Sequence, residues 1–199
     1  MDIETLTQQV LNTLFVELEA SGRHVHVTKA QAEVLFGHPL TPARELSQPG
    51  QFLAKERVTV IGPKGQFQNV AVLGPERPEA QVEISLTDGR DLGITPPIRP
   101  SGSVAGSPGV KLSSSAGQVT LKEGVIVAQR HIHVNAEDAA RLGLQDKQMV
   151  RLQTYTERPV VFDQLLVRIH PQFQTRVHLD YDEANACGFR NGDLGRILT

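Results

Sequence analysis

Histidines spaced two residues apart are the side chains of this 199-residue sequence with the clearest capacity for chemistry. They form two pairs, His24 with His26 and His131 with His133, and one apolar residue separates the members of each pair. Side chains two residues apart on a β-strand point to the same face, so both imidazoles of a pair can bind one ion. The apolar residue then faces the buried side. The spacing predicts two strands that each present a histidine pair to a metal.

A catalytic metal needs further ligands, and two other side chains are the best candidates. Neutral imidazole binds zinc, copper, iron or nickel, and zinc is the expected metal in a cytosolic setting. A catalytic zinc has about three protein ligands and an open position. His178 is the best additional histidine, because it lies on a predicted strand close in sequence to the second pair. Glu83 is the best carboxylate, because it is the acidic residue of the strand-like segment 81–85.

The histidine pairs belong to a longer internal repeat. Arg-His-Val-His-Val, which begins at Arg23, returns 107 residues later as Arg-His-Ile-His-Val, which begins at Arg130. In each copy a helix-capping residue, a short helix and a terminating glycine follow, over 28–37 and 135–143. A single His-x-His pair is weak support for a metal site, but two copies with the same flanks favour metal binding. The repeat predicts two similar subdomains.

Three arginines near these motifs leave two interpretations open. Arg23 and Arg130 precede the histidine pairs, and Arg77 follows a Gly-Pro turn. A guanidinium matches two oxygens of a phosphate group with parallel hydrogen bonds, so each arginine could form part of an anion site. For any one arginine taken alone, a surface salt bridge is the favoured interpretation.

The other histidines outside the repeat and the single cysteine fit ordinary structural positions. Cys187 has no sequence partner that marks it as a nucleophile, and we expect a small buried residue at a helix end. One cysteine cannot form an intrachain disulfide, which fits a cytoplasmic location. His38 and His170 each stand before a proline and are expected on the surface.

Short β-strands are predicted to position these residues. Seventeen glycines, twelve prolines and only 5% aromatic residues favour short elements joined by turns, such as a hairpin turn at 62–65. The expected strands cover 15–19, 57–61, 67–73, 81–85, 110–112, 118–121, 125–129, 148–153, 160–162, 165–169 and 175–179. We therefore expect a mainly β protein of two small closed antiparallel β-barrels with short capping α-helices, since closure removes exposed strand edges.

Residues 1–13 are predicted to form an amphipathic helix, because their apolar side chains recur at helical spacing. Such a helix either packs on the body of the protein or binds a groove of a partner protein. The sequence has a net charge of −2, no run of 18 apolar residues, and no Lys or Arg in residues 1–19. We therefore expect no nucleic-acid partner, no membrane and no standard export signal.

An ordered series of motifs accompanies the histidine repeats along nearly the whole sequence. It comprises Leu46–Gln51, Gly62–Gly65, Leu73–Arg77, Gln81–Ser85, Leu92–Ile94, Ser101-Gly102, Gly106–Gly109, Gly124–Ile126, Val161–Asp163 and Asp182–Ala186. In these blocks the chain resembles the PduL-type phosphotransacylases, the phosphate propanoyltransferases associated with bacterial microcompartments. So many blocks in one order are more specific than any single motif.

The resemblance implies two interlaced barrels and two zinc sites. Residues 14–22 and 129–199 would form barrel 1, and residues 23–128 would form barrel 2 with a short insertion near 38–55. Arg77 would be a catalytic residue in contact with phosphate. The zinc ligands, for two ions per chain, would be His24, His26 and Glu83 in one site and His131, His133 and His178 in the other.

The resemblance also implies substrates and partners. Acyl-CoA (propionyl-CoA or acetyl-CoA) and phosphate would be converted reversibly to acyl phosphate and coenzyme A, with no acyl-enzyme on Cys187. Residues 1–13 look like the encapsulation peptide of the family. The expected partners are therefore microcompartment shell or core proteins, the expected location is the microcompartment lumen within the cytoplasm, and a homo-oligomer, a dimer, is the expected assembly.

Two alternatives use the same residues. A dinuclear zinc hydrolase would attack an ester or phosphoester with metal-activated water. A scaffold with structural zinc would enclose each ion with four protein ligands.

Overall fold

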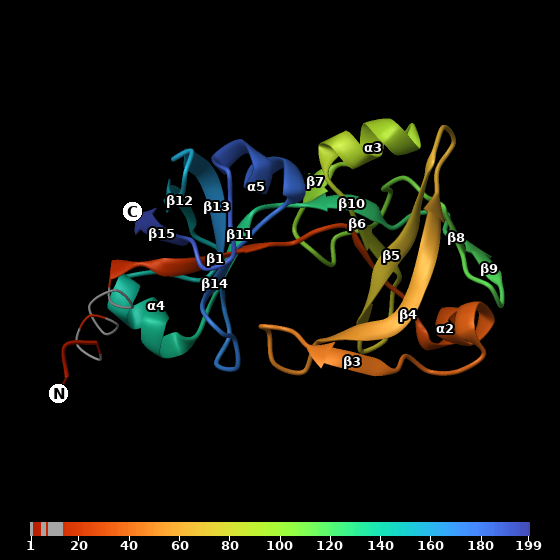
Figure 1. The fold of residues 1–199 in the computed structure, drawn as a ribbon, viewed down its shortest axis with the longest axis horizontal. Coiled ribbons are helices and arrows are strands. Elements are labelled where there is room, and N and C mark those ends of the chain that lie inside the picture. The colour runs from red at the N-terminus through yellow and green to blue at the C-terminus, as the bar shows by residue number, and fades with distance from the viewer. Residues whose placement is uncertain (1, 5–6, 8–13) are drawn as a thin grey trace. The chain divides into compact units, whose positions relative to one another are not determined.

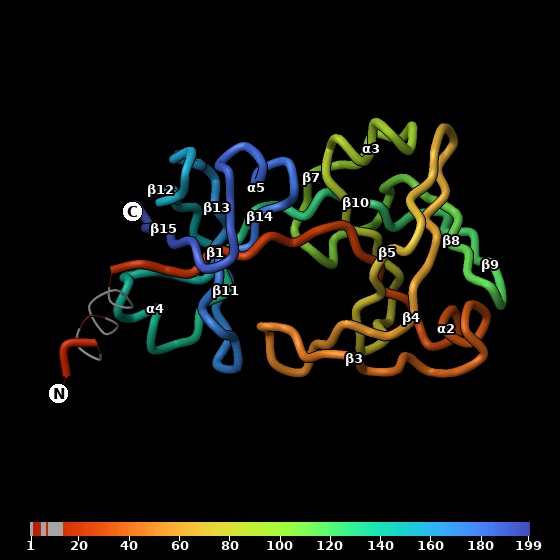
Figure 2. The backbone as a smooth tube through the Cα atoms, viewed as in Figure 1, coloured from red at the N-terminus to blue at the C-terminus, as the bar shows by residue number. Residues whose placement is uncertain are grey.

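The computed structural model describes residues 2–4, 7 and 14–199. The amphipathic helix expected over 1–13 therefore lies largely outside the described residues. The chain divides into two compact units, and Figures 1 and 2 show that its path leaves the first unit, forms the second and then returns. Unit 1 combines the segment up to Ser21 with Arg130–Thr199, and unit 2 consists of Gly22–Gln129. None of the helices in the described part of the chain has the length and apolar character that a membrane span requires.

Unit 1 contains a closed barrel, and over residues 14–21 and 130–199 its strands are accompanied by helices α4 (Ala136–Leu142) and α5 (Tyr181–Cys187). Its strands are β1 (Val16–Ala20), β11 (His131–Val134), β12 (Met149–Tyr155), β13 (Val161–Ile169), β14 (Arg176–Leu179) and β15 (Leu194–Leu198). They follow the order β1, β14, β11, β13, β12, β15, and β15 pairs with β1 to close the barrel. Helices α4 and α5 follow β11 and β14. Closure gives every strand two neighbours, which removes exposed edges.

Unit 2 is a larger sheet, also with two helices. Its strands are β2 (His24–His26), β3 (Pro42–Glu45), β4 (Phe52–Ile61), β5 (Gln66–Gly74), β6 (Gln81–Glu83), β7 (Ile98–Arg99), β8 (Lys111–Ser113), β9 (Gln118–Thr120) and β10 (Val125–Ala128). Their order is β7, β10, β6, β2, β5, β4, β8, β9, and β3 pairs with β4. Helix α2 (Lys29–Phe36) follows β2, and α3 (Leu86–Leu92) follows β6.

The mainly β fold class with short helices is confirmed, and two details differ from the expected architecture. The ladders are mixed, since β11 runs parallel to β13 and β2 runs parallel to β5. The connections through α4 and α2 are long enough for the crossovers that parallel pairing requires. Among the described residues, the sheet of unit 2 forms an open path from β7 to β9 and not a closed ring.

Each histidine strand passes through the core of its unit. Val25 is fully buried between its two histidines and lies opposite Val72 on β5 and Val82 on β6. Ile132 is fully buried in the same way in unit 1. Full burial of such a side chain contributes roughly 1.5–3 kcal/mol. The predicted division into an apolar face and a histidine face is confirmed.

The two helices that follow the histidine strands begin and end where predicted. Thr28 precedes α2 and Asn135 precedes α4, and each side chain accepts a hydrogen bond from the backbone N–H of the third helical residue. Gly37 and Gly143 terminate the helices with φ of 75° and 66°, a left-handed conformation that favours glycine. These caps fix where the chain leaves each histidine strand.

The predicted turn at 62–65 is confirmed as the hairpin between β4 and β5. The Gly62 N–H donates to the Gly65 carbonyl over 2.9 Å. A Cβ atom on Gly62 would lie 2.4 Å from the Leu92 carbonyl oxygen at the end of α3. Glycine therefore allows the hairpin and the helix to approach closely.

Candidate metal centres

The same strand register places a third potential ligand opposite each histidine pair. β2 runs antiparallel to β6, so that His24 lies opposite Glu83. β11 runs antiparallel to β14, so that His131 lies opposite His178. Directly opposed residues on one face of such a pair have Cβ atoms about 4.5–5.5 Å apart. The internal repeat thus extends to β6 and β14, where the third residues differ in type.

In unit 2 the predicted residues His24, His26 and Glu83 come together as one buried group. Their potential ligand atoms all lie within 4.8 Å of one another. His24 Nε2 is 3.6 Å from Glu83 Oε1, and the three residues are 7%, 2% and 8% exposed, respectively. We call this the carboxylate group. Two imidazoles and a carboxylate are a donor set that zinc accepts.

Backbone carbonyls orient both imidazoles of the carboxylate group. His24 Nδ1 lies 2.9 Å from the Gly22 carbonyl oxygen, and His26 Nδ1 lies 3.2 Å from that of Leu73. A carbonyl oxygen only accepts, so each Nδ1 carries the proton and donates it. In the neutral form of each imidazole, Nε2 is then the atom with a lone pair for a metal, as is usual when the other ring nitrogen donates to a carbonyl.

The charges within the carboxylate group are strongly coupled. Burial would lower the pKa of His24, but the charge and hydrogen bond of Glu83 outweigh burial and raise it. Burial, followed by the positive charges of His24 and Arg77, lowers the pKa of His26 to about 2. Burial would raise the pKa of Glu83, but His24 outweighs it and holds that pKa below its ordinary value. A neutral His26 and an ionised Glu83 are the forms that bind metals.

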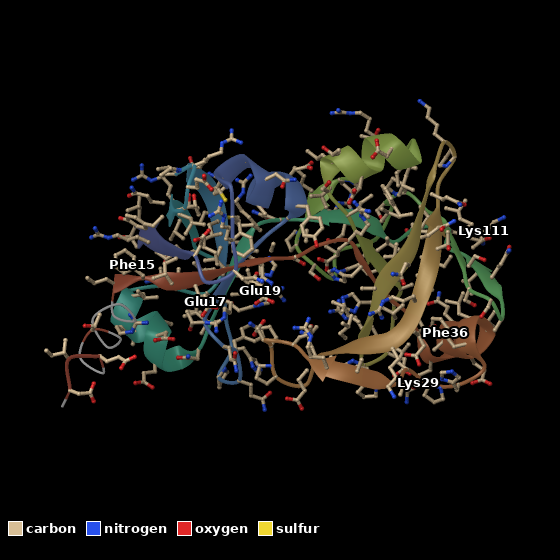
Figure 3. All side chains as sticks on the ribbon, in the orientation of Figure 1. Phe15, Glu17, Glu19, Lys29, Phe36 and Lys111 are labelled. Atoms are coloured by element: carbon tan, nitrogen blue, oxygen red, sulfur yellow. The ribbon has the colours of Figure 1, made fainter. Side chains whose placement is uncertain are left out.

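In unit 1 the predicted residues His131, His133 and His178 also come together, and we call them the histidine group. Their ring nitrogens also lie within 4.8 Å of one another. His133 Nδ1 is 3.3 Å from His178 Nε2, and the His131 and His178 rings stack with centroids 5.0 Å apart. Glu19 on β1, which Figure 3 labels, has its Oε2 atom 4.0 Å from His178 Nε2. Three neutral imidazoles also form a set that zinc accepts.

Arg23 and Arg130 form salt bridges within their own units. Arg23 Nη2 and Nε donate to the Asp88 carboxylate over 2.8 and 3.2 Å, and Arg130 Nε donates to Glu183 over 2.5 Å. Asp88 and Glu183 are the third residues of α3 and α5, the helices that follow the strands of Glu83 and His178. Of the two interpretations that the sequence left open, the salt bridge is the one observed for both arginines.

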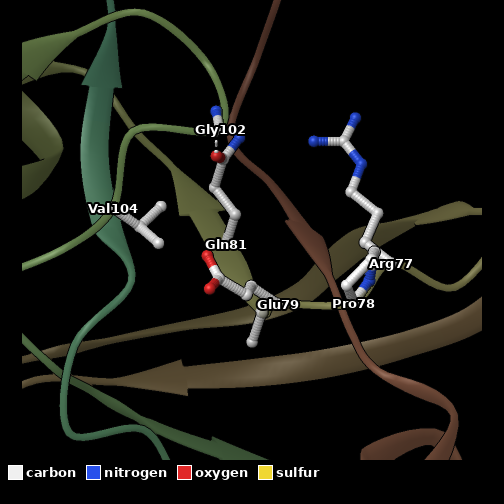
Figure 4. A pocket seen from close by; sticks show the side chains of 7 residues that line it. Arg77, Pro78, Glu79, Gln81, Gly102 and Val104 are labelled. Carbon is white, nitrogen blue, oxygen red and sulfur yellow. Dashed lines mark hydrogen bonds between the residues drawn. The ribbon is translucent and has the colours of Figure 1, made fainter.

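Arg77 lines a pocket beside the carboxylate group. The pocket has a volume of about 240 Å³, and its walls are formed by Arg77, Pro78, Glu79, Ala80, Gln81, Gly102 and Val104 (Figure 4). The Arg77 backbone N–H donates to the Val27 carbonyl over 2.9 Å, which ties this loop to the end of the histidine strand. Its positive charge acts to lower the pKa of both His24 and His26. A guanidinium that lines a pocket is suited to an anion.

Sequence reasoning missed Gln81 and Ser101, which contact the carboxylate group. Gln81 Nε2 and Ser101 Oγ both donate to Glu83 Oε1, over 2.5 and 2.8 Å. Gln81 precedes Glu83 by two residues on β6, so its place on the same face was the available signal. Ser101 carries no such signal, because it reaches Glu83 from a separate loop.

The predictions for the residues outside these groups are confirmed. Cys187 is fully buried at the end of α5, where burial raises the pKa of its thiol. Its Sγ lies 3.4 Å from the Ala184 carbonyl oxygen. His38 and His170 are exposed.

Each of the two β units brings together three side chains that could hold a metal ion, and one of these groups lies beside a pocket that Arg77 lines. A family model for phosphate propanoyltransferase matches residues 17–190. The chain belongs to the phosphate propanoyltransferase family and is an acyltransferase, so the resemblance inferred from the sequence is confirmed.

Relatives named phosphate propanoyltransferase match the chain over most of its length. One from Enterococcus faecalis is 52% identical over 198 residues, which cover 98% of this chain and 93% of the relative. One from Leptotrichia buccalis is 53% identical over 182 residues, 90% of this chain and 86% of the relative. One from Thermotoga maritima is 47% identical over 181 residues, 89% of this chain and 86% of the relative.

Proposed function

We propose that the chain transfers a short acyl group, propionyl or acetyl, reversibly between coenzyme A and phosphate, and that this activity depends on two zinc ions. The observation that carries the proposal is the presence of one complete three-residue ligand group in each unit of a chain from this family. The carboxylate group would hold one zinc, and the histidine group would hold the other.

The residues present fit zinc on chemical grounds. In the carboxylate group, the hydrogen bonds from both Nδ1 atoms leave the Nε2 atoms of His24 and His26 for the ion, and Glu83 supplies a charge. In the histidine group, all donors are imidazole nitrogens. When bound, zinc supplies a Lewis acid that can polarise a thioester carbonyl and stabilise a departing thiolate.

Arg77 is the residue that we propose to bind phosphate. Its guanidinium can donate two parallel hydrogen bonds to phosphate oxygens while its charge offsets that of the anion. Phosphate is already nucleophilic at neutral pH, so the task of the protein is to position it and neutralise its charge. No covalent acyl-enzyme is required, which agrees with the full burial of Cys187.

An assay of thiol release separates this proposal from the alternatives. Purified protein is incubated with propionyl-CoA, with and without phosphate, and free thiol and acyl phosphate are both measured. Acyl transfer predicts thiol release that requires phosphate and equals the acyl phosphate formed. Thiol release without phosphate would instead indicate the dinuclear zinc hydrolase. Failure of zinc to restore activity after removal by a chelator would refute the zinc dependence.

We further propose that residues 1–13 bind shell or core proteins and bring the chain into a microcompartment lumen, and that the chain forms a homodimer. The apolar spacing of these residues and the resemblance to the family's encapsulation peptide support the first part. Deletion of residues 2–13 should preserve acyl transfer and abolish co-purification with assembled shells. Sedimentation of the purified protein tests the dimer.

A further inference from the structure

The carboxylate of Glu83 is held by two side chains that are not themselves metal-ligand candidates. Gln81 Nε2 and Ser101 Oγ donate to the same oxygen, Oε1, over 2.5 and 2.8 Å. Gln81 Nε2 also lies 2.8 Å from Ser101 Oγ. Two donors on one oxygen fix the rotation of the carboxylate on its side chain. The carboxylate is thereby held beside His24, whose Nε2 lies 3.6 Å from Oε1.

The amide of Gln81 is itself fixed at its other end. The Gly102 N–H donates to Gln81 Oε1 over 2.7 Å. A backbone N–H can only donate, so the amide oxygen must face Gly102 and the NH₂ group must face Glu83. Gln81 is 2% exposed, and its amide is satisfied on both sides. A buried network with every member paired is rigid.

In unit 1, the strand that corresponds to β6 has no glutamine at the matching position. Gln81 lies opposite His26 in the β2–β6 ladder, and Arg176 lies opposite His133 in the equivalent β11–β14 ladder. Arg176 forms an ion pair with Glu17 over 2.9 Å. The glutamine therefore accompanies the unit whose third ligand is a carboxylate, which needs donors to orient it.

We infer that Gln81 and Ser101 are positioning residues that preset the Glu83 carboxylate for a metal ion, an inference that rests on the zinc dependence proposed above. Outer hydrogen-bond partners of metal ligands typically contribute 10–100-fold in metal affinity. Gln81 also lines the Arg77 pocket, whereas Ser101 does not. Ser101 therefore separates an effect on the metal ligand from an effect on the pocket.

Zinc titration of the full-length protein tests the inference. Metal-free protein is equilibrated in zinc-buffered solutions, and bound zinc per chain is measured against free zinc. We expect Ser101→Ala to weaken one of two zinc sites at least tenfold, and Ser101→Thr, which keeps the hydroxyl, to restore most of the affinity. Ser103→Ala is the matched control, because Ser103 is an exposed serine of the same loop. At saturating zinc, Ser101→Ala should regain turnover with an unchanged KM for phosphate.

Each outcome bears on the inference separately from the proposed function. If Ser101→Ala and Gln81→Leu bind both zinc ions as tightly as the original chain, the positioning role is wrong while zinc-dependent acyl transfer stands. If the original chain binds no zinc, both are wrong. If circular dichroism reveals that Gln81→Leu does not fold, the comparison of Ser101→Ala with Ser101→Thr decides.

Discussion

Glu83 gives the carboxylate group a charge that the histidine group does not have. Glu83→Gln keeps the size of the side chain and removes this charge, so we expect one of two zinc ions to be lost. Loss of transition-state stabilisation by a bound metal should lower kcat/KM by on the order of 10²-fold, or about 2.7 kcal/mol. Metal analysis and steady-state kinetics check both expectations. Glu33→Gln, an exposed glutamate of α2, is the control, and normal zinc content with normal turnover in Glu83→Gln would contradict the assignment.

Substitution of Cys187 tests whether its buried thiol serves packing or catalysis. Its side chain is fully buried against the unit 1 core, and burial raises the pKa of its thiol. We expect Cys187→Ala to keep full acyl transfer and to lower the free energy of unfolding by about 1 kcal/mol, because one buried sulfur atom is removed. Activity measurements and urea unfolding test this. A folded variant that had lost most of its activity would implicate the thiol in catalysis.

The residues grouped by strand spacing were predictable, whereas their hydrogen-bond partners were not. Two histidines separated by one residue share a face by strand geometry alone. Ser101 meets Glu83 because a loop returns to β6, and Asp88 meets Arg23 across 65 residues of sequence. Contacts of this kind depend on the tertiary fold, which local spacing does not specify.

Elements with strong local signals were predicted, and those without them were missed. Helices α2 and α4 carry a capping residue and a terminating glycine, and both match their expected bounds. α3 was missed because Gly89 interrupts it, although Ser85 and Asp88 form a capping box. β3 is exposed along its whole length, so it lacks the apolar alternation of a strand. The expected strands 160–162 and 165–169 form one strand, β13. The polar residues between them break the apolar alternation, and Gln164 has a φ of 57°.

The start of α4 should contribute stability that depends on pH. Partial burial would raise the pKa of Asp138, but hydrogen bonds from Thr175 and Arg141 outweigh it and hold that pKa below its ordinary value. A carboxyl group with a lowered pKa stabilises the fold above its ordinary pKa, and this contribution is lost as the pH falls through the folded-state value. We therefore expect Asp138→Asn to lower the free energy of unfolding by about 1–2 kcal/mol near neutral pH.

Urea unfolding of both proteins at several pH values tests this expectation. The difference between the original chain and Asp138→Asn should shrink below about pH 4, where the unfolded carboxyl group becomes protonated. A difference that does not change across this range would mean that packing, and not the charge of Asp138, stabilises the helix start.

At the scale of the whole molecule, each ligand group is built entirely within one unit. We therefore expect the two zinc ions to be lost independently. His131→Ala should abolish activity and retain one zinc, and addition of Glu83→Gln should remove the second. Zinc at 100 times its dissociation constant stabilises a folded unit by about 2.7 kcal/mol, so a chelator should lower the unfolding temperature of the original chain and leave that of the double variant unchanged. Loss of both ions in His131→Ala alone would contradict independent sites.

The internal repeat predicted two similar subdomains, and β2 and β11 each pair with one parallel and one antiparallel strand. The composition correctly predicted short strands joined by turns. It did not predict that the strands of unit 1 form a closed barrel whereas the sheet of unit 2 forms an open path. The barrel of unit 1 closes because β15 pairs with β1. Nearly the whole sequence separates these two strands, so local sequence patterns did not predict that they pair.

The pairing of β1 with β14 and β15 sets an order for assembly during synthesis. All residues of unit 2 have been made once Gln129 has been added, so this unit can fold while the ribosome is still working. β1 has no partner in the barrel until Arg176–Leu179 and Leu194–Leu198 emerge. At 5–20 residues per second this delay is on the order of 10 s. β1 is therefore made before unit 2, yet it gains both of its barrel neighbours only after nearly all of unit 1 has followed.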